Sequence, residues 1–185
     1  MGIIKKLAGF VFDIIETVVL ALAIFVVIYL FLFQPHQVKG ASMEHSFFDG
    51  EYILTDKVSY RLHFPKRGDV VIFKAPRNPD LDYIKRIIGL PGEKVKIENG
   101  NVFINGSKLE EDYLSDDIVI SGGLYLPKGK EVEIPENSLF VLGDNRSHSS
   151  DSREWGPIST GDIVGRAFLR YWPPKQVGIL PKAKY

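Results

Sequence analysis

The chain has 185 residues, of which 45% are hydrophobic, and this is enough for the core of one domain with an appendage. Lysine plus arginine and aspartate plus glutamate each number 23, so the sequence lacks the basic excess that non-specific nucleic-acid binding needs. The absence of cysteine excludes disulfides, thiolate nucleophiles and cysteine-based metal sites. No two histidines have the i, i+4 spacing of a helical metal pair. We therefore expect no nucleic-acid partner, no metal and no other cofactor.

An uncharged apolar run extends from Thr17 to Phe33. At about 1.5 Å per residue it spans roughly 26 Å, close to the ~30 Å hydrocarbon core of a bilayer, and Ile14 and Ile15 extend it. Residues 14–33 are therefore predicted to form a transmembrane anchor. A buried core helix and a cleavable signal peptide are the alternatives, but no small-x-small cleavage pattern follows the run.

Flanking charges predict how this anchor is oriented. Lys5 and Lys6 precede the run and Lys39 follows it, which favours a cytoplasmic N-terminus under the positive-inside rule. We expect residues 1–13 in the cytoplasm and a catalytic domain at 34–185 on the extracytoplasmic face of the cell membrane.

Beyond residue 33 the pattern changes to short runs of β-branched and aromatic residues between glycines and prolines. These runs predict strands at 51–55, 69–73, 82–88, 93–97, 102–104, 131–134, 139–142 and 163–169. Asn99-Gly100 is a strong signal for a two-residue hairpin, and Asn105-Gly106 marks the next reversal. The fold class is therefore mainly β and mostly antiparallel, with a less regular insertion or small β subdomain at about 106–136.

The strand predicted around Lys85 places cations among apolar residues. With a period of two, Lys85 shares a face with Tyr83 and Ile87, and Arg86 lies on the other face. Such a lysine either extends to water along its apolar stem or is desolvated for chemistry. This strand alone does not decide between the two.

Three polar stretches stand out from the β pattern: residues 40–43, the strand of Lys85, and the loop 143–153. Taken singly, they are typical of a turn serine, a surface lysine and a loop held by an Asx turn or an ion pair. Taken together, they offer a serine hydroxyl and a lysine that, when neutral, can act as its base. Lowering a lysine pKa from about 10.4 to about 7–8 costs roughly 4 kcal/mol, which burial can supply.

These stretches resemble the signature motifs of type I signal peptidases, the bacterial single-anchor leader peptidases. The similarity lies in Gly40-x-Ser42-Met43, in 67–71 (RGDVV), in 85–92 (KRIIGLPG), and in 143–145 (GDN) with the polar positions that follow. Their order and the preceding anchor match as well, so the resemblance covers nearly the whole chain.

The resemblance implies a Ser–Lys dyad in a β-rich fold, with Ser42 as nucleophile and Lys85 as general base. The backbone N–H of Ser42 would stabilise the oxyanion, and Ser149 would hydrogen-bond the lysine amine. Supporting roles fall to an Asp151–Arg153 ion pair and to structural residues in the same loop. The positions that carry over as supporting or structural are Gly143, Asp144, Arg146, Ser149, Asp151 and Arg153.

The implied substrates are signal peptides of exported pre-proteins, added as an extended strand at the membrane surface with lipid as the second partner. The implied substrate-binding positions are Val38, Met43, Phe47, Tyr83 and Ile84. One departure is His45, where the family usually has proline, and this predicts a less constrained backbone after the nucleophile. Two alternatives stay open: a self-cleaving Ser–Lys protease, and a non-catalytic membrane-anchored β module that binds signal peptides.

Overall fold

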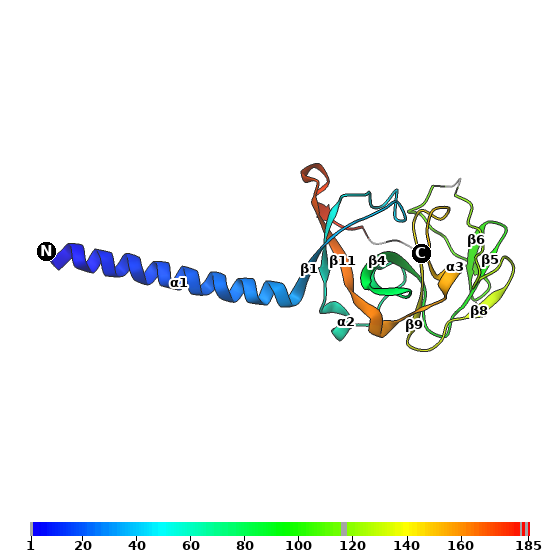
Figure 1. The fold of residues 1–185 in the computed structure, drawn as a ribbon, viewed down its shortest axis with the longest axis horizontal. Coiled ribbons are helices and arrows are strands. Elements are labelled where there is room, and N and C mark those ends of the chain that lie inside the picture. Colours follow the sequence, from blue (N-terminus) through cyan, green and yellow to red (C-terminus); the bar gives the residue numbers. More distant parts are fainter. Residues whose placement is uncertain (1, 116–117, 182, 184) are drawn as a thin grey trace.

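The computed structural model consists of one long helix attached to a β domain (Figure 1). It describes residues 2–115, 118–181, 183 and 185, with the backbone alone for 3–5, so the side chain of Lys5 lies outside the described part. Helix α1 (Gly2–Leu32) extends away from the domain as a rod. Its most apolar stretch is 0% buried, unlike the core helix of a soluble domain. The strand β1 then begins at Phe33, the last residue of the predicted anchor.

The β domain contains a large eight-stranded sheet, in which every pairing is antiparallel. The strand order is β1-β2-β11-β3-β4-β9-β10, and β12 also pairs with β11. The bounds are β1 (Phe33–Gln37), β2 (Tyr52–Asp56), β3 (Val70–Ala75), β4 (Asn78–Gly89), β9 (Ser138–Leu142), β10 (Ile158–Ser159), β11 (Ile163–Trp172) and β12 (Gly178–Ile179).

A second, four-stranded sheet has the order β7-β6-β5-β8. Its strands are β5 (Lys94–Glu98), β6 (Asn101–Ile104), β7 (Ser107–Lys108) and β8 (Glu131–Glu133). Asn99 and Gly100 have φ of 48° and 76°, as the predicted two-residue turn requires, and Asn105 at 51° makes the next reversal. The chain between β7 and β8 is irregular where it is described.

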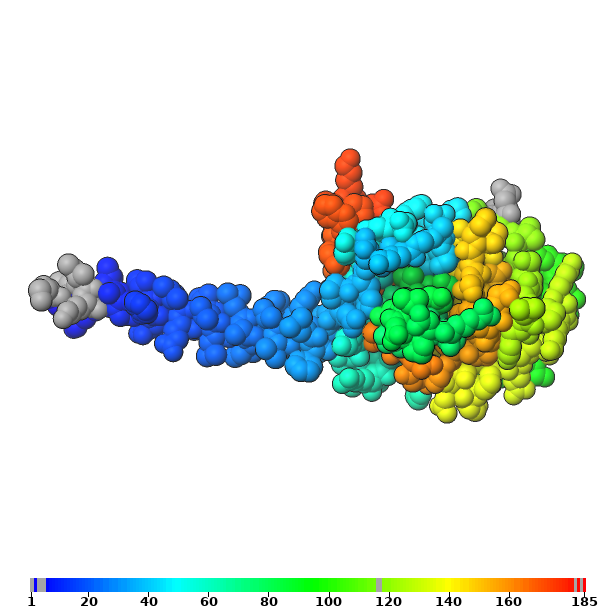
Figure 2. Space-filling model, viewed as in Figure 1, coloured from blue at the N-terminus to red at the C-terminus, as the bar shows by residue number. Residues whose placement is uncertain are grey.

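Four short helical segments connect the strands. They are α2 (Ser59–Leu62), α3 (Ser152–Trp155) and the 3₁₀ turns η1 (Thr160–Asp162) and η2 (Pro174–Gln176). In the space-filling view, the segment after β11 projects from the domain close to its junction with α1 (Figure 2). Trp172, the last residue of β11, is exposed, and so are Val177 and Ile179 after it.

Strand β3 is buried on both faces and lies between two apolar clusters. Val70 and Ile72 join a cluster with Val38, Met43, Phe47, Ile53 and Ile84, while Val71 and Phe73 join one with Ile87, Leu139, Val141 and Ile158. The third cluster fills the space between the two sheets and includes Ile88, Val95 and Phe140. The strand carrying Lys85 pairs with β3 along most of its length, so it is fixed within the core.

The fold agrees with the prediction of a mainly β, antiparallel domain behind an apolar helix. The sequence did not predict β1, whose Gln34, Pro35 and His36 lack a strand pattern. It forms because residues 33–37 pair with 52–56 of β2. The small sheet also begins before residue 106, because the Asn99-Gly100 hairpin belongs to it.

Candidate active site

Ser42 and Lys85 are brought together from segments 43 residues apart. Ser42 lies in a turn after β1, closed by the N–H of Glu44, which donates to the carbonyl of Ala41 at 3.1 Å. Lys85 lies in the middle of β4. Its Nζ is 2.8 Å from Ser42 Oγ and 2.9 Å from the carbonyl oxygen of Ile84. The amine is therefore within hydrogen-bonding reach of the hydroxyl.

Lys85 is only 4% exposed, so it does not extend to bulk water. Burial lowers its pKa from 10.5 to about 8, and the carboxylates of Asp151 and Asp144 oppose that shift without cancelling it. Nζ also lies over the face of the Tyr83 ring, 5.5 Å from the ring centre. A substantial fraction of the amine is thus neutral near pH 8, and only the neutral form can accept a proton.

The loop after β9 is fixed by the Asp151–Arg153 pair, which was expected. Arg153 Nε is 2.7 Å from Asp151 Oδ1, and its Nη2 is 2.8 Å from Oδ2. Asp151 also accepts from the N–H of Gly143 at 3.1 Å and caps α3 by accepting from the N–H of Arg153. The ion pair therefore holds both ends of the loop that faces Ser42.

Gly143 lies where that loop comes closest to the nucleophile. A Cβ at this position would overlap both the Ser149 side chain and the carbonyl oxygen of Ser42. The N–H of Asn145 donates to the same carbonyl at 3.1 Å, so the loop also holds the backbone of Ser42. Only glycine permits this approach.

Ser149 differs from the expectation. The described residues include no hydrogen bond between Ser149 and the Lys85 amine, and Ser149 Oγ is buried without a partner. Lys85 instead donates to the backbone carbonyl of Ile84. Every strand residue has such a carbonyl, so no sequence motif could have identified this acceptor.

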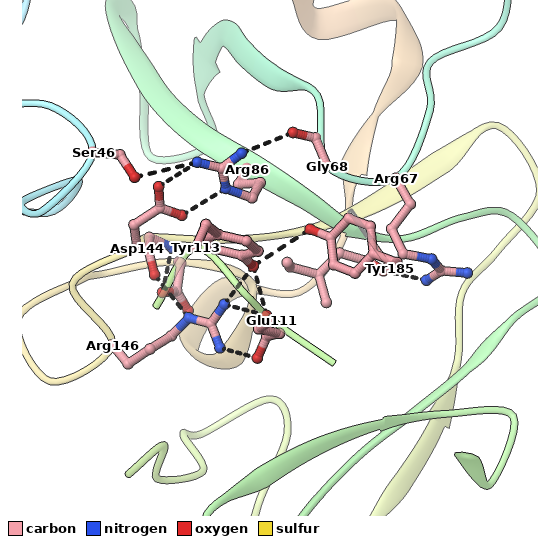
Figure 3. A network of polar contacts seen from close by, with 12 residues as sticks. Ser46, Arg67, Gly68, Arg86, Glu111, Tyr113, Asp144, Arg146 and Tyr185 are labelled. Carbon is pink, nitrogen blue, oxygen red and sulfur yellow. Dashed lines mark hydrogen bonds and ion pairs between the residues drawn. The ribbon is translucent and has the colours of Figure 1, made fainter. Parts of the chain in front are cut away.

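Arg86, next to Lys85, lies at the centre of a buried polar network (Figure 3). Its Nε and Nη2 are 2.8 and 2.6 Å from the two oxygens of Asp144, and Nη1 donates to the carbonyl of Gly68 at 2.9 Å. Its guanidinium stacks 4.1 Å from the centre of the Tyr113 ring. The strand pattern placed Arg86 on the face opposite Lys85 but did not identify its partner.

The same network contains residues that the sequence did not single out. Arg146 binds the carboxylate of Glu111 and donates to the hydroxyl of Tyr113 at 3.0 Å. Glu111 and Tyr113 belong to the irregular segment after β7, which has no periodicity. Only the excess of charge in that segment could have suggested a partner for Arg146.

A cavity of about 230 Å³ opens beside the Ser42–Lys85 pair. Three of the predicted substrate-binding residues line it: Val38, Tyr83 and Ile84. Met43 and Phe47 do not line it: they are buried in the core cluster that also contains Val38 and Ile84, and Phe47 lines a separate cavity. Their contribution to the cavity is therefore through packing.

The cavity lies between two strand edges. Strand β4 pairs with β9 only from Arg86 onward, so before that residue the edge of β4 opposite β3 pairs with no strand in the described part of the chain. Strand β1 pairs with β2 alone among the described strands. An extended peptide placed here would find backbone groups on both sides.

The turn after Ser42 is constrained at His45. The sequence had predicted a less constrained backbone there. His45 adopts φ of 81°, which a proline ring, limited to about −65°, cannot reach. The turn is closed by the N–H groups of Ser46 and Phe47, which donate to the carbonyl of Met43 at 3.1 and 2.8 Å. His45 lines a second cavity, apart from the one beside Lys85.

Residues 11–172 match the protein family described as "Signal peptidase, peptidase S26". The chain belongs to this family. It is 37% identical to a probable signal peptidase I-2 of Synechocystis over 89% of this chain and 75% of that protein. It is 35% identical to signal peptidase IB of Staphylococcus aureus over 87% of this chain and 91% of that protein.

Among solved structures, a signal peptidase I of Enterococcus faecalis is 32% identical, with a TM-score of 0.46, and the match covers 56% of this chain and 97% of the other. Family membership also bears on α1, whose residues Lys6–Leu32 are long and apolar enough to cross a membrane. Together, the helix and the family fit a membrane-anchored protein.

Proposed function

We propose that this chain is a membrane-anchored serine endopeptidase that removes signal peptides from exported pre-proteins, with Ser42 as nucleophile and Lys85 as general base. The observation that carries the proposal is the 2.8 Å separation between a buried lysine amine and a serine hydroxyl at the mouth of a cavity. A lysine with a lowered pKa is the base that such a serine requires. The family and its named relatives support the same activity.

In the proposed mechanism, the neutral Lys85 amine takes the proton of Ser42 Oγ as the oxygen attacks the scissile carbonyl. The Ser42 N–H, which donates no hydrogen bond within the described part of the chain, stabilises the oxyanion. The lysine then gives its proton to the leaving amine, which frees the mature protein and leaves an acyl-enzyme. In the second half, Lys85 takes a proton from water as the water attacks the ester. It then gives that proton to Ser42 Oγ as the ester bond breaks, which releases the signal peptide and restores the neutral amine.

The substrate would enter as an extended strand between the unpaired edges near Val38 and Ile84. Strand β1 follows α1 without an intervening loop, so this cleft lies near the membrane surface. With residues 1–13 in the cytoplasm and 34–185 outside, the apolar part of a signal peptide reaches the cleft from the lipid. Asp144, Asp151 and Arg153 hold the loop and the strand that frame the dyad.

The proposal is tested by cleavage of a pre-protein by the full chain in detergent. Ser42→Ala and Lys85→Ala should each lower kcat by about 10³-fold or more, as loss of a nucleophile or base does. Lys130→Ala is the matched control for Lys85→Ala and should cleave normally, because Lys130 is exposed and does not line the cavity. Cleavage by either dyad variant at the rate of the unchanged chain would refute the assignment.

The two alternatives give different results. A non-catalytic module would bind signal peptide without turnover and would not react at Ser42 with a serine-directed probe. A self-cleaving protease would shorten its own chain during long incubation without added substrate. Labelling of Ser42, with an intact chain and a cleaved pre-protein, excludes both.

A further inference from the structure

Two side chains meet across the gap between β1 and β4. These strands are separated in the sheet order by β2, β11 and β3 and share no backbone pairing. Nevertheless, His36 Nε2 on β1 is 3.3 Å from Asp82 Oδ2 on β4. Both residues line the cavity that contains Ser42 and Lys85. The contact therefore joins the two walls of the cleft.

Each partner is held in place from its own side. His36 Nδ1 lies 3.0 Å from the hydroxyl of Thr55, which is buried on the neighbouring β2. Asp82 Oδ1 lies 2.8 Å from the amine of Lys74 on β3. The two side chains are 13% and 23% exposed, so each is largely screened from water, although the bond between them lies at the protein surface.

Hydrogen-bond chemistry limits how the contact is made. A carboxylate only accepts, so Asp82 requires a proton on His36 Nε2. The side-chain nitrogen of Gln34 lies 3.2 Å from the same ring nitrogen of His36, and an amide nitrogen can only donate. Both bonds cannot exist together, so the Gln34 amide must present its oxygen, or lose the contact, when His36 bonds Asp82.

The contact lies on the membrane side of the dyad. Asp82 precedes Lys85 by three residues on β4, which is about 10 Å along a strand. His36 is the fourth residue after the end of α1 at Leu32. Substrate residues upstream of the cleavage site, which lead back to the apolar segment in the lipid, would pass this point.

Adding a strand here requires room. Paired strands lie about 4.8 Å apart, so a peptide strand between β1 and β4 needs their backbones to be roughly 10 Å apart and the space between them to be free. The contact between His36 and Asp82 crosses the gap between the two strands, within the lining of the cavity. Because the two side chains bond each other, the free protein pays an opening cost each time a peptide enters.

We infer that His36 and Asp82 form a latch, a pair of positioning residues that closes the membrane-facing end of the cleft and must part before the upstream segment of a peptide substrate can pair there. The inference rests on the proposed function for the identity of the peptide. A closed latch lowers apparent affinity in proportion to the fraction of open molecules. A single hydrogen bond at the surface of the cleft corresponds to about 2–10-fold in that fraction.

The test measures peptide binding without cleavage. Full-length Ser42→Ala in detergent is titrated with a fluorescent signal-peptide segment that spans the cleavage site, alone or with His36→Ala or Asp82→Ala. Each latch substitution should lower Kd about 2–10-fold. Lys94→Ala is the control, since it removes an exposed lysine of the four-stranded sheet that does not line the cavity, and it should leave Kd within about twofold. Unfolding midpoints verify that all variants fold.

Two further readouts distinguish a latch from a structural role. In the Ser42→Ala background, the double latch variant should bind no more tightly than a single one, because either substitution opens the latch. With Ser42 restored, the latch variants should show a lower KM at unchanged kcat. Equal or weaker binding in both single variants would overturn the inference. Tighter binding together with failure of the unchanged chain to cleave would reject the proposed function and leave the latch standing.

Discussion

Replacing Lys85 with methionine should make the protein more stable at neutral pH while abolishing its activity. Methionine has a similar length and no charge, so it fills the same buried strand position. The perturbed pKa is the reason for the expected gain. A buried amine whose pKa falls to about 8 is penalised in the folded state whenever it is protonated.

The size and pH range of the effect follow from linkage. The pKa is about 8 in the folded protein and 10.5 as the reference for the unfolded chain, which corresponds to roughly 3 kcal/mol. Between these values the unfolded chain binds more protons, so the stability of the unchanged protein rises with pH. This contribution is complete above about pH 10.5 and is lost as the pH falls through 8. Methionine has no such dependence.

Denaturant unfolding of the full chain in detergent, followed by intrinsic fluorescence, can test this prediction. The stability of Lys85→Met minus that of the unchanged protein should shrink by about 3 kcal/mol between pH 7 and pH 10.5. Loss of the bonds to Ser42 and Ile84 offsets part of the gain at every pH, so the slope is the robust quantity. A pH-independent difference would refute the buried, neutral lysine.

Three other predictions concern the same region. Cleavage rate should rise from pH 6 and level off above about pH 8, because the neutral amine is the working form; a flat profile would argue against Lys85 as base. Asp144→Ala should destabilise the protein by about 3–5 kcal/mol in denaturant unfolding, because it leaves Arg86 buried without its carboxylate, whereas Asp80→Ala on the surface should not. Because His45 has a positive φ, His45→Gly should raise the free energy of unfolding by about 1 kcal/mol and His45→Pro should lower it. Stabilisation by proline would show that φ is not positive there.

Much of the fold was predictable because local signals agreed with the tertiary structure. The uncharged run near the N-terminus and the Asn-Gly reversals depend on hydropathy and turn stereochemistry, which act within a few residues. Strand β1 was not predictable, because its sequence contains Gln34, Pro35 and His36 and its order comes from pairing with β2. An edge strand of this kind depends on a partner rather than on its own propensity.

The candidate site divides in the same way. A lysine within an apolar strand pattern and a serine in a glycine turn could be found from sequence, and so could an Asp–Arg pair two residues apart. The contacts of Arg86 with Asp144 and of Arg146 with Glu111 could not, since they join residues 58 and 35 positions apart through the tertiary fold. The same is true of the latch, where 46 residues separate His36 from Asp82.

The departure at His45 changes how the placement of the nucleophile is understood. A missing proline suggested a looser turn, but a left-handed residue is itself restrictive, and the turn is tied to the core through Phe47, which is 2% exposed. On the other side, Asn145 holds the carbonyl of Ser42 from the loop that Gly143 brings close. The nucleophile is therefore fixed from two directions, by core packing after it and by the Asp151-braced loop beside it, and neither requires proline.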